Sequence, residues 1–348
     1  LSMVALSFKI GEQVFERRTA LVAASVVALW PSLLLHTTQL LRDPLFILMM
    51  LVMVLIWVRW LRGKRTLRGG LTEGFVCGAA SVVVWVTRYN MWAMVILFTL
   101  VAALFLIVRQ LRERRWLTGN VAGAALLLLM IGSTPSIVGR FLQPDVFISD
   151  PEVPAEAPSS IPLCLDEPTA SAASINEDSS IWSRLLARAD SAVMRVGKIR
   201  RAFDRSYANA GSNMDACVRL SSVSDLLRYL PRALSHGFLA PYPSMWTSEG
   251  NSVGRSGRLL SGAEMTALYL IELLAVFGVW RGRRSLPVWF IAIVAIAGIA
   301  ALGFAVANAA ILFRLRYVFM ILVIILGAGG SVEALSLLGA KRARFEGH

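Results

Sequence analysis

The stretch PLFILMMLVMVLIWV, residues 44–58, contains no charged, amide or hydroxyl side chain. A helix of about 20 residues, rising about 1.5 Å per residue, crosses the ~30 Å hydrocarbon core of a bilayer. Because lipid offers the backbone no hydrogen-bond partner, an apolar block of this kind is expected to form a membrane-spanning helix. The stretch therefore predicts an integral membrane protein.

Apolar blocks recur along the 348 residues, of which 56% are hydrophobic and 16% charged, whereas soluble domains are about 25% charged. The sequence predicts an all-α, polytopic membrane helix bundle of about nine spans. We expect the tail of one span at 1–10 and further spans at about 19–38, 44–59, 71–87, 91–108, 119–138, 264–280, 286–304 and 317–337.

These blocks divide the chain into an N-terminal transmembrane bundle, 1–138, a polar region, 139–262, and a C-terminal bundle with a basic tail, 263–348. Residues 139–180 are rich in Pro, Ala, Ser and acidic side chains, a composition typical of flexible segments. Residues 181–262 are predicted to be helical or interfacial. Their first apolar face, from Leu185 to Phe203, either packs on the bundle or lies in the bilayer interface, with Arg and Lys opposite.

The net charge of +13 would suggest nucleic acid as the partner of a soluble protein. Here 17 of the 35 Lys and Arg residues fall in five short clusters between or after the apolar blocks, at 17–18, 59–68, 109–115, 281–284 and 341–344. Lys and Arg accumulate in cytoplasmic loops. We therefore expect a multi-pass protein of the inner (plasma) membrane, with the 139–262 region exoplasmic, the C-terminus cytoplasmic and no nucleic-acid partner.

The chain begins with Leu1, and residues 1–10 resemble the end of a span. We therefore expect a native N-terminal portion to precede Leu1.

The sequence holds no Walker, HExxH, CxxC or GxSxG motif, and its three histidines are scattered. No metal site is predicted and no cofactor is assigned, although a divalent cation stays open. Cys164 and Cys217 both fall in the exoplasmic region, where they either form a disulfide or remain two thiols. The four-residue spacing of Gly70, Gly74 and Gly78 indicates close helix packing.

Charged residues at the outer ends of spans are the candidate site, because ionisable groups there face a cavity or a partner. They are Arg42, Asp43, Arg88, Glu264, Arg314 and Arg316. A carboxylate among several arginines suits a phosphate-bearing lipid and a hydroxyl acceptor.

Each candidate also has a structural interpretation. Asp43 before Pro44 is typical of a helix N-terminus, and Arg88 is compatible with snorkelling to the interface. Arg314 and Arg316 would then anchor the outer boundary of the last span, and Glu264 would have a structural role.

Three segments, which carry all of these residues except Glu264, resemble GT-C membrane glycosyltransferases, the group of protein O-mannosyltransferases and the lipid A aminoarabinose transferase. The matching motifs are RRTAL (17–21) through ALWP (28–31) to LRDPL (41–45), GFVCG (74–78) with TRYN (87–90), and FRLRY (313–317). The resemblance lies mainly within 12–108 and 305–330.

This resemblance implies transfer of a sugar from polyprenyl phosphate to a glycan, lipid or protein acceptor on the exoplasmic face. By position, Asp43 is similar to the second acidic residue of that group and is our candidate catalytic residue. Arg42, Arg88, Glu264, Arg314 and Arg316 are the candidate substrate-binding residues. The group's general base, in the first outer loop, has no counterpart because the chain begins after that loop.

Two other functions stay open from the sequence. A surface-polysaccharide polymerase or ligase would use paired arginines of the large loop, for which Arg184, Arg188, Arg200 and Arg201 are candidates. A non-catalytic component of an envelope assembly or export complex would need neither Asp43 nor Arg88. A transporter is disfavoured, because Glu272 is the one central charge in a predicted span and no inverted repeat is evident.

Overall fold

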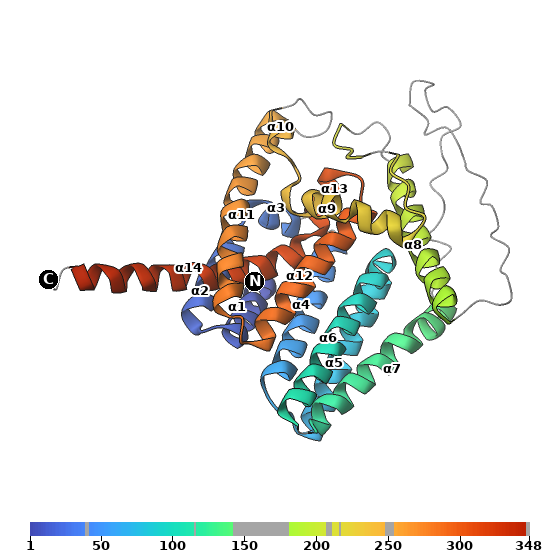
Figure 1. Cartoon of the computed structure of the whole chain (residues 1–348), viewed down its shortest axis with the longest axis horizontal. Helices are drawn as coiled ribbons and strands as arrows, with labels where there is room; N and C mark the ends of the chain where they lie inside the picture. Colours follow the sequence, from blue (N-terminus) through green and yellow to red (C-terminus); the bar gives the residue numbers. More distant parts are fainter. Residues whose placement is uncertain are drawn as a thin grey trace. The chain divides into compact units, whose positions relative to one another are not determined.

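A computed structural model of the chain describes residues 1–38, 42–114, 116–141, 181–206, 211–215, 217–247 and 254–345 (Figure 1). All named elements within these ranges are helices, which confirms the predicted all-α class. They are α1 (Ser2–Val14), α2 (Arg17–Leu29), α3 (Pro31–Thr38), α4 (Arg42–Arg62), α5 (Leu67–Thr87), η1 (Tyr89–Met91), α6 (Trp92–Glu113), α7 (Thr118–Phe141), α8 (Ile181–Ser206), α9 (Val223–Leu239), α10 (Pro243–Trp246), α11 (Arg255–Arg281), α12 (Leu286–Ala305), α13 (Ala309–Leu315) and α14 (Tyr317–Phe345).

Seven of the described helices are long and apolar enough to cross a membrane: α4, α5, α6 with η1, α7, α11, α12 and α14. The chain is therefore a multi-pass membrane protein. The count is seven rather than about nine because α1 and α2 have 13 residues each. Pro31 lacks a backbone N–H and disfavours helix at Trp30, so the expected span at 19–38 is divided into α2 and α3.

The chain divides into two compact units. The first contains residues 1–143, 261–298 and 316–348, and the second contains 144–260 and 299–315. Of the segment expected to be flexible, residues 139–141 close α7, and residues 142–180 lie outside the described ranges.

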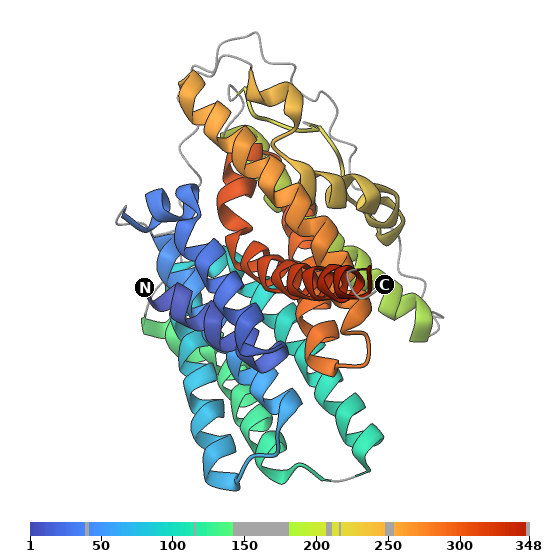
Figure 2. The ribbon, with the colours of Figure 1, turned by 90° about the vertical axis from the view of Figure 1, so that its left-hand side faces the viewer.

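In the first unit, α4 to α7 run alongside one another in alternating directions, coloured blue to green (Figure 1, Figure 2). Glycines set the separation of α5 and α7. A Cβ atom added to Gly70 would lie 1.8 Å from the Gly119 carbonyl oxygen, and one added to Gly74 would lie 2.4 Å from that of Gly123. The expected packing role of these glycines is confirmed.

Close packing at glycines also joins α11 to α14. A Cβ at Gly278 would lie 2.2 Å from the Leu326 carbonyl oxygen, and one at Gly330 would lie 2.0 Å from that of Leu274. Without a hydrophobic force between helices in lipid, such close backbone contact is a principal source of attraction.

Polar side chains close the α4–α5 loop. The carbonyl oxygens of Trp60 and Gly63 accept hydrogen bonds from Arg109 and from Asn120, the latter at 2.8 and 3.0 Å. Arg109 is buried. This arginine of a basic cluster therefore holds the fold, a role that the sequence analysis did not assign to the clusters.

We predict that Gly74→Ala lowers the free energy of unfolding by about 1–3 kcal/mol, because the new methyl group meets backbone rather than a movable side chain. Gly132→Ala is the matched control on α7, since a Cβ there meets nothing within 4 Å. Unfolding can be followed in detergent with a thiol-reactive dye that reports exposure of buried Cys77. Equal destabilisation by both changes would contradict the glycine contact.

Candidate functional site

Asp43 and Arg88 form an ion pair in the first unit. Asp43 lies in the first turn of α4, and Arg88 follows the last residue of α5. Because α4 and α5 are antiparallel neighbours, these positions share one end of the pair. The Arg88 Nη2 atom donates to Oδ1 of Asp43. The structure thus brings together two predicted site residues that are 45 positions apart in the sequence.

Burial of the Asp43 carboxylate strengthens its ion pair with Arg88. The side chain of Asp43 is 3% exposed, whereas that of Arg88 is 27% exposed. A buried carboxylate is costly unless it is paired, and a negative charge also suits the first turn of a helix. Asp43 is therefore one of the helical residues of α4, and its carboxylate points to Arg88. Arg42, the first residue of α4, is exposed.

Glu264 lies in a second polar group. Its carboxylate accepts hydrogen bonds from the Ser32 backbone N–H at 2.7 Å and from the Ser32 hydroxyl at 2.5 Å. The Tyr317 hydroxyl in turn donates to Ser32 Oγ at 2.5 Å. Glu264 is 4% exposed. These bonds join α3, α11 and α14, and the sequence analysis assigned no role to Ser32.

Arg316 extends the same group. It is 1% exposed, and its Nη2 atom lies 2.8 Å from the sulfur of Met265, the neighbour of Glu264. The Glu272 carboxylate exerts a favourable electrostatic interaction on Arg316. Ser32, Glu264, Arg316 and Tyr317 are called the Glu264 cluster below.

Arg314 lies half-buried on α13 in the second unit, whereas Arg316 and Tyr317 belong to the first. The structure pairs Asp43 with Arg88, and it places Arg316 against Met265, the neighbour of Glu264.

The two groups lie on helices of the same unit. Ser32 is the second residue of α3, and Asp43 lies in the first turn of α4, the next helix along the chain. The first unit therefore contains two buried carboxylates and two arginines. Arginine presents a planar fork of donors to phosphate, and a carboxylate accepts a proton from a hydroxyl.

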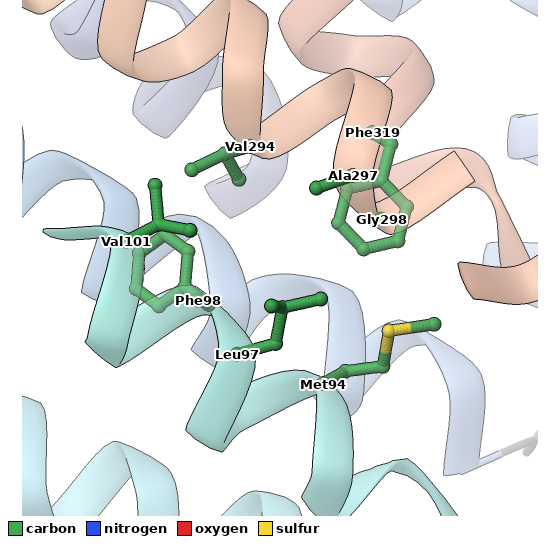
Figure 3. A pocket seen from close by; sticks show the side chains of 8 residues that line it. All are labelled: Met94, Leu97, Phe98, Val101, Val294, Ala297, Gly298 and Phe319. Atoms are coloured by element: carbon green, nitrogen blue, oxygen red, sulfur yellow. The ribbon is translucent and has the colours of Figure 1, made fainter. Parts of the chain in front are cut away.

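The described residues around these groups form no cluster that could hold a metal ion. In the described ranges no three His, Cys, Asp or Glu side chains could hold a metal ion together. A small pocket between α6, α12 and α14 is lined by Met94, Leu97, Val294, Phe319 and other apolar residues (Figure 3). It offers a sugar or phosphate no hydrogen bond from a side chain.

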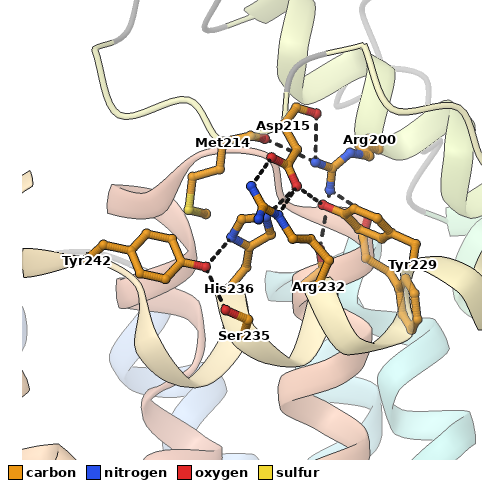
Figure 4. Close-up of polar contacts among 10 residues, drawn as sticks. Arg200, Met214, Asp215, Tyr229, Arg232, Ser235, His236 and Tyr242 are labelled. Carbon is orange, nitrogen blue, oxygen red and sulfur yellow. Dashed lines mark hydrogen bonds and ion pairs between the residues drawn. The ribbon is translucent and has the colours of Figure 1, made fainter. Parts of the chain in front are cut away.

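The second unit contains a polar network centred on Asp215 (Figure 4). Its carboxylate accepts two hydrogen bonds from Arg232, at 2.8 and 2.9 Å, and one from Tyr229 at 3.2 Å. The Nε2 atom of His236 lies 2.7 Å from the same carboxylate. On the other side of the imidazole, the Tyr242 hydroxyl lies 2.8 Å from Nδ1.

The charge states of this network follow from its contacts. The Arg232 guanidinium lowers the pKa of Asp215, and burial lowers the pKa of His236. A carboxylate only accepts, so Nε2 of neutral His236 carries the proton and Nδ1 accepts from Tyr242. From the sequence, His236 was one of three scattered histidines without a metal motif, and its partners prove to lie 21 and 6 residues away.

Arg200 supports the loop that carries Asp215. It is fully buried and donates to the carbonyl oxygens of Gly303, Phe304, Met214 and Asp215 at 3.1–3.3 Å. Asp215 has a positive φ of 49°, which Asp adopts more readily than most residues. Arg200 thus fixes the loop that presents Asp215 and satisfies carbonyl groups near the end of α12.

Two of the three cysteines, Cys77 and Cys217, lie among the described residues. Cys77 is a buried free thiol, and Cys217 forms a disulfide. Cys164 lies outside the described residues, so the Cys164–Cys217 bond stays a prediction.

Together, the fold and these sites define a polytopic α-helical membrane protein with buried carboxylate–arginine groups in its spanning unit. Comparison of the chain with protein-family models, with curated proteins and with solved structures gives no match.

We predict that stability falls as the pH decreases from 7.5 to 5.5. An unfolded histidine takes up a proton below its ordinary pKa of about 6.5. Folded His236, whose pKa is lowered, does not take up this proton until the pH is lower still. The contribution of neutral His236 to the free energy of unfolding is therefore complete above pH ~6.5 and is lost below it.

Thermal unfolding in detergent across this pH range checks the prediction. His236→Gln should be less stable at pH 7.5 and should show a flatter pH dependence, whereas His348→Gln should keep the wild-type slope. An unchanged slope in His236→Gln would show that another group causes the effect.

Proposed function

We propose that this chain acts in a membrane glycosyltransferase that moves a sugar from a polyprenyl-phosphate donor to an envelope glycan, lipid or protein acceptor. The observation that carries the proposal is the Asp43–Arg88 pair, in which a buried carboxylate meets a partly exposed arginine at one end of the spanning unit.

The chemistry of the transfer calls for these groups. When the bond between sugar and lipid phosphate breaks, negative charge develops on the phosphate, and an arginine can stabilise it with two parallel hydrogen bonds. Arg88 is the first candidate, because part of its side chain reaches the surface. Arg316 is the second, as the buried cation of the Glu264 cluster.

A carboxylate is needed at the acceptor. It takes the proton from the attacking hydroxyl or orients the group that does so. Asp43 is our candidate on this side, and its bond to Arg88 would hold both groups in one site. Glu264 already accepts two hydrogen bonds from Ser32, which favours a positioning role for Glu264.

The expected sidedness agrees with this assignment. The basic clusters favour an exoplasmic location for the starts of α4 and α14 and the end of α5, in the inner (plasma) membrane. The resemblance to GT-C glycosyltransferases implies a donor and an acceptor on that face.

The polymerase or ligase alternative loses part of its support. It depends on paired arginines of the large loop, and Arg200 is fully buried against four carbonyl groups. Arg184, Arg188 and Arg201 are exposed.

Binding of the leaving group tests the proposal without knowledge of the sugar. We expect a C55 polyprenyl phosphate to raise the melting temperature of the purified chain by a few degrees, as a ligand well above its Kd does. C55 polyprenol, which lacks only the phosphate, should give little shift. Arg88→Gln should lose most of the difference between the two lipids.

Arg281→Gln is the matched control. Arg281 also pairs with a carboxylate between helices of the first unit, that of Glu333, but these side chains are 46% and 35% exposed, far more than that of Asp43. Equal shifts with the phosphate and the alcohol, or full retention of the phosphate effect in Arg88→Gln, would overturn the assignment.

A further inference from the structure

Helix α8 has 26 residues, and its two halves differ in their surroundings. The C-terminal half packs inside the second unit, where Val193 is 6% exposed and belongs to a core with Leu220, Ala233 and Phe304. A Cβ at Gly197 would lie 2.4 Å from the Leu220 carbonyl oxygen. The C-terminal half of α8 is therefore fixed by packing within the second unit.

The N-terminal half continues the same apolar face beyond that core. Leu186 precedes Val193 by seven residues, so the two side chains share one face of the helix. Trp182, Leu185 and Leu186 are nevertheless 76%, 49% and 58% exposed. Three large apolar side chains on one helix form an exposed patch of the kind that marks a membrane or partner contact.

An arginine stripe lies on the face of α8 opposite this patch. Arg184, Arg188 and Arg195 are spaced by four and seven residues, which places them along one side of the helix, and all are exposed. Tryptophan and leucine on one face with arginines on the other are typical of helices in the plane of a membrane interface.

The C-terminal half of α8 is attached to the end of a membrane-spanning helix. Arg200 donates to the carbonyl oxygens of Gly303 and Phe304, in the last turns of α12. Helix α12 spans the membrane, so its end marks the bilayer boundary. The exposed patch on the other half of α8 is thereby tethered near lipid.

We infer that the N-terminal half of α8 lies in the membrane interface and binds anionic phospholipid. Trp182, Leu185 and Leu186 occupy the boundary between headgroups and acyl chains, and Arg188 and Arg195 contact headgroup phosphates. The sequence was compatible with packing against protein or with the bilayer interface. The C-terminal half of α8 therefore has the first surroundings, and the N-terminal half has the second. The inference does not depend on the proposed function.

The test uses the full chain in lipid nanodiscs with an environment-sensitive NBD label at Leu186→Cys. Ser191→Cys is the matched control, because Ser191 is exposed on the opposite face of the same helix. Wild-type chain labelled in parallel gives the contribution of Cys77. We expect a shallow doxyl-labelled lipid to quench the label at 186 at least twice as strongly as the label at 191.

The arginines are tested with nanodiscs of phosphatidylcholine alone or with phosphatidylglycerol. Quenching at position 186 should increase with the anionic lipid, and Arg188→Gln with Arg195→Gln should remove the increase. The double variant Arg201→Gln with Arg205→Gln removes the same amount of charge from another face of α8. This variant should retain the increase in quenching with anionic lipid.

Equal quenching at both positions would overturn the inference. So would a blue-shifted label at position 186 that no lipid quenches, since a protein surface would then cover the patch. Quenching at position 186 without any response to anionic lipid would overturn the phospholipid assignment.

Discussion

The hydrocarbon core of a bilayer supplies no hydrogen-bond partner, and the rest of this structure depends on that constraint. The backbone satisfies itself in seven long helices. Charged and polar side chains that enter the protein must find partners there, as Asp43 does with Arg88, Glu264 with Ser32, and Arg109 with loop carbonyl groups. The buried charges therefore determine which helix ends meet.

Close helix contact holds the same helices together elsewhere. Glycines bring α5 against α7 and α11 against α14, so that backbone touches backbone. These contacts lie near the start of α5 and the end of α11, whereas Arg88 follows the end of α5 and Glu264 lies near the start of α11. Apolar packing and polar pairing therefore join different parts of these helices.

Much of the fold could be predicted from local sequence. Apolar length predicted α4, where 44–59 was expected and Arg42–Arg62 is found, and glycine spacing predicted the α5 contact. The break at Pro31 was missed because apolarity continues across it. Alternation of basic loops led us to expect Asp43 and Arg88 on one side, but the sequence did not predict that the two side chains pair.

The remaining site residues could not be predicted, because their partners are remote in sequence. Ser32 bonds to Glu264 across 232 positions, and Arg200 reaches Gly303 across 103. Neither contact leaves a spacing or a motif in the sequence. The Asp215–His236–Tyr242 network was missed for another reason: a single histidine in a loop region carries no signal until the fold supplies its partners.

A double-mutant cycle on Asp43 and Arg88 tests the central claim, that buried charges in this protein are held by mutual pairing. Asp43→Asn, Arg88→Gln and the double variant would be unfolded in mixed micelles, with Glu333 and Arg281 as the exposed comparison pair. We predict single losses of about 3–5 kcal/mol and a double loss well below their sum. For the exposed pair we predict a coupling of about 0–1 kcal/mol. Additive losses at Asp43 and Arg88, or a coupling no larger than that of the exposed pair, would contradict the account.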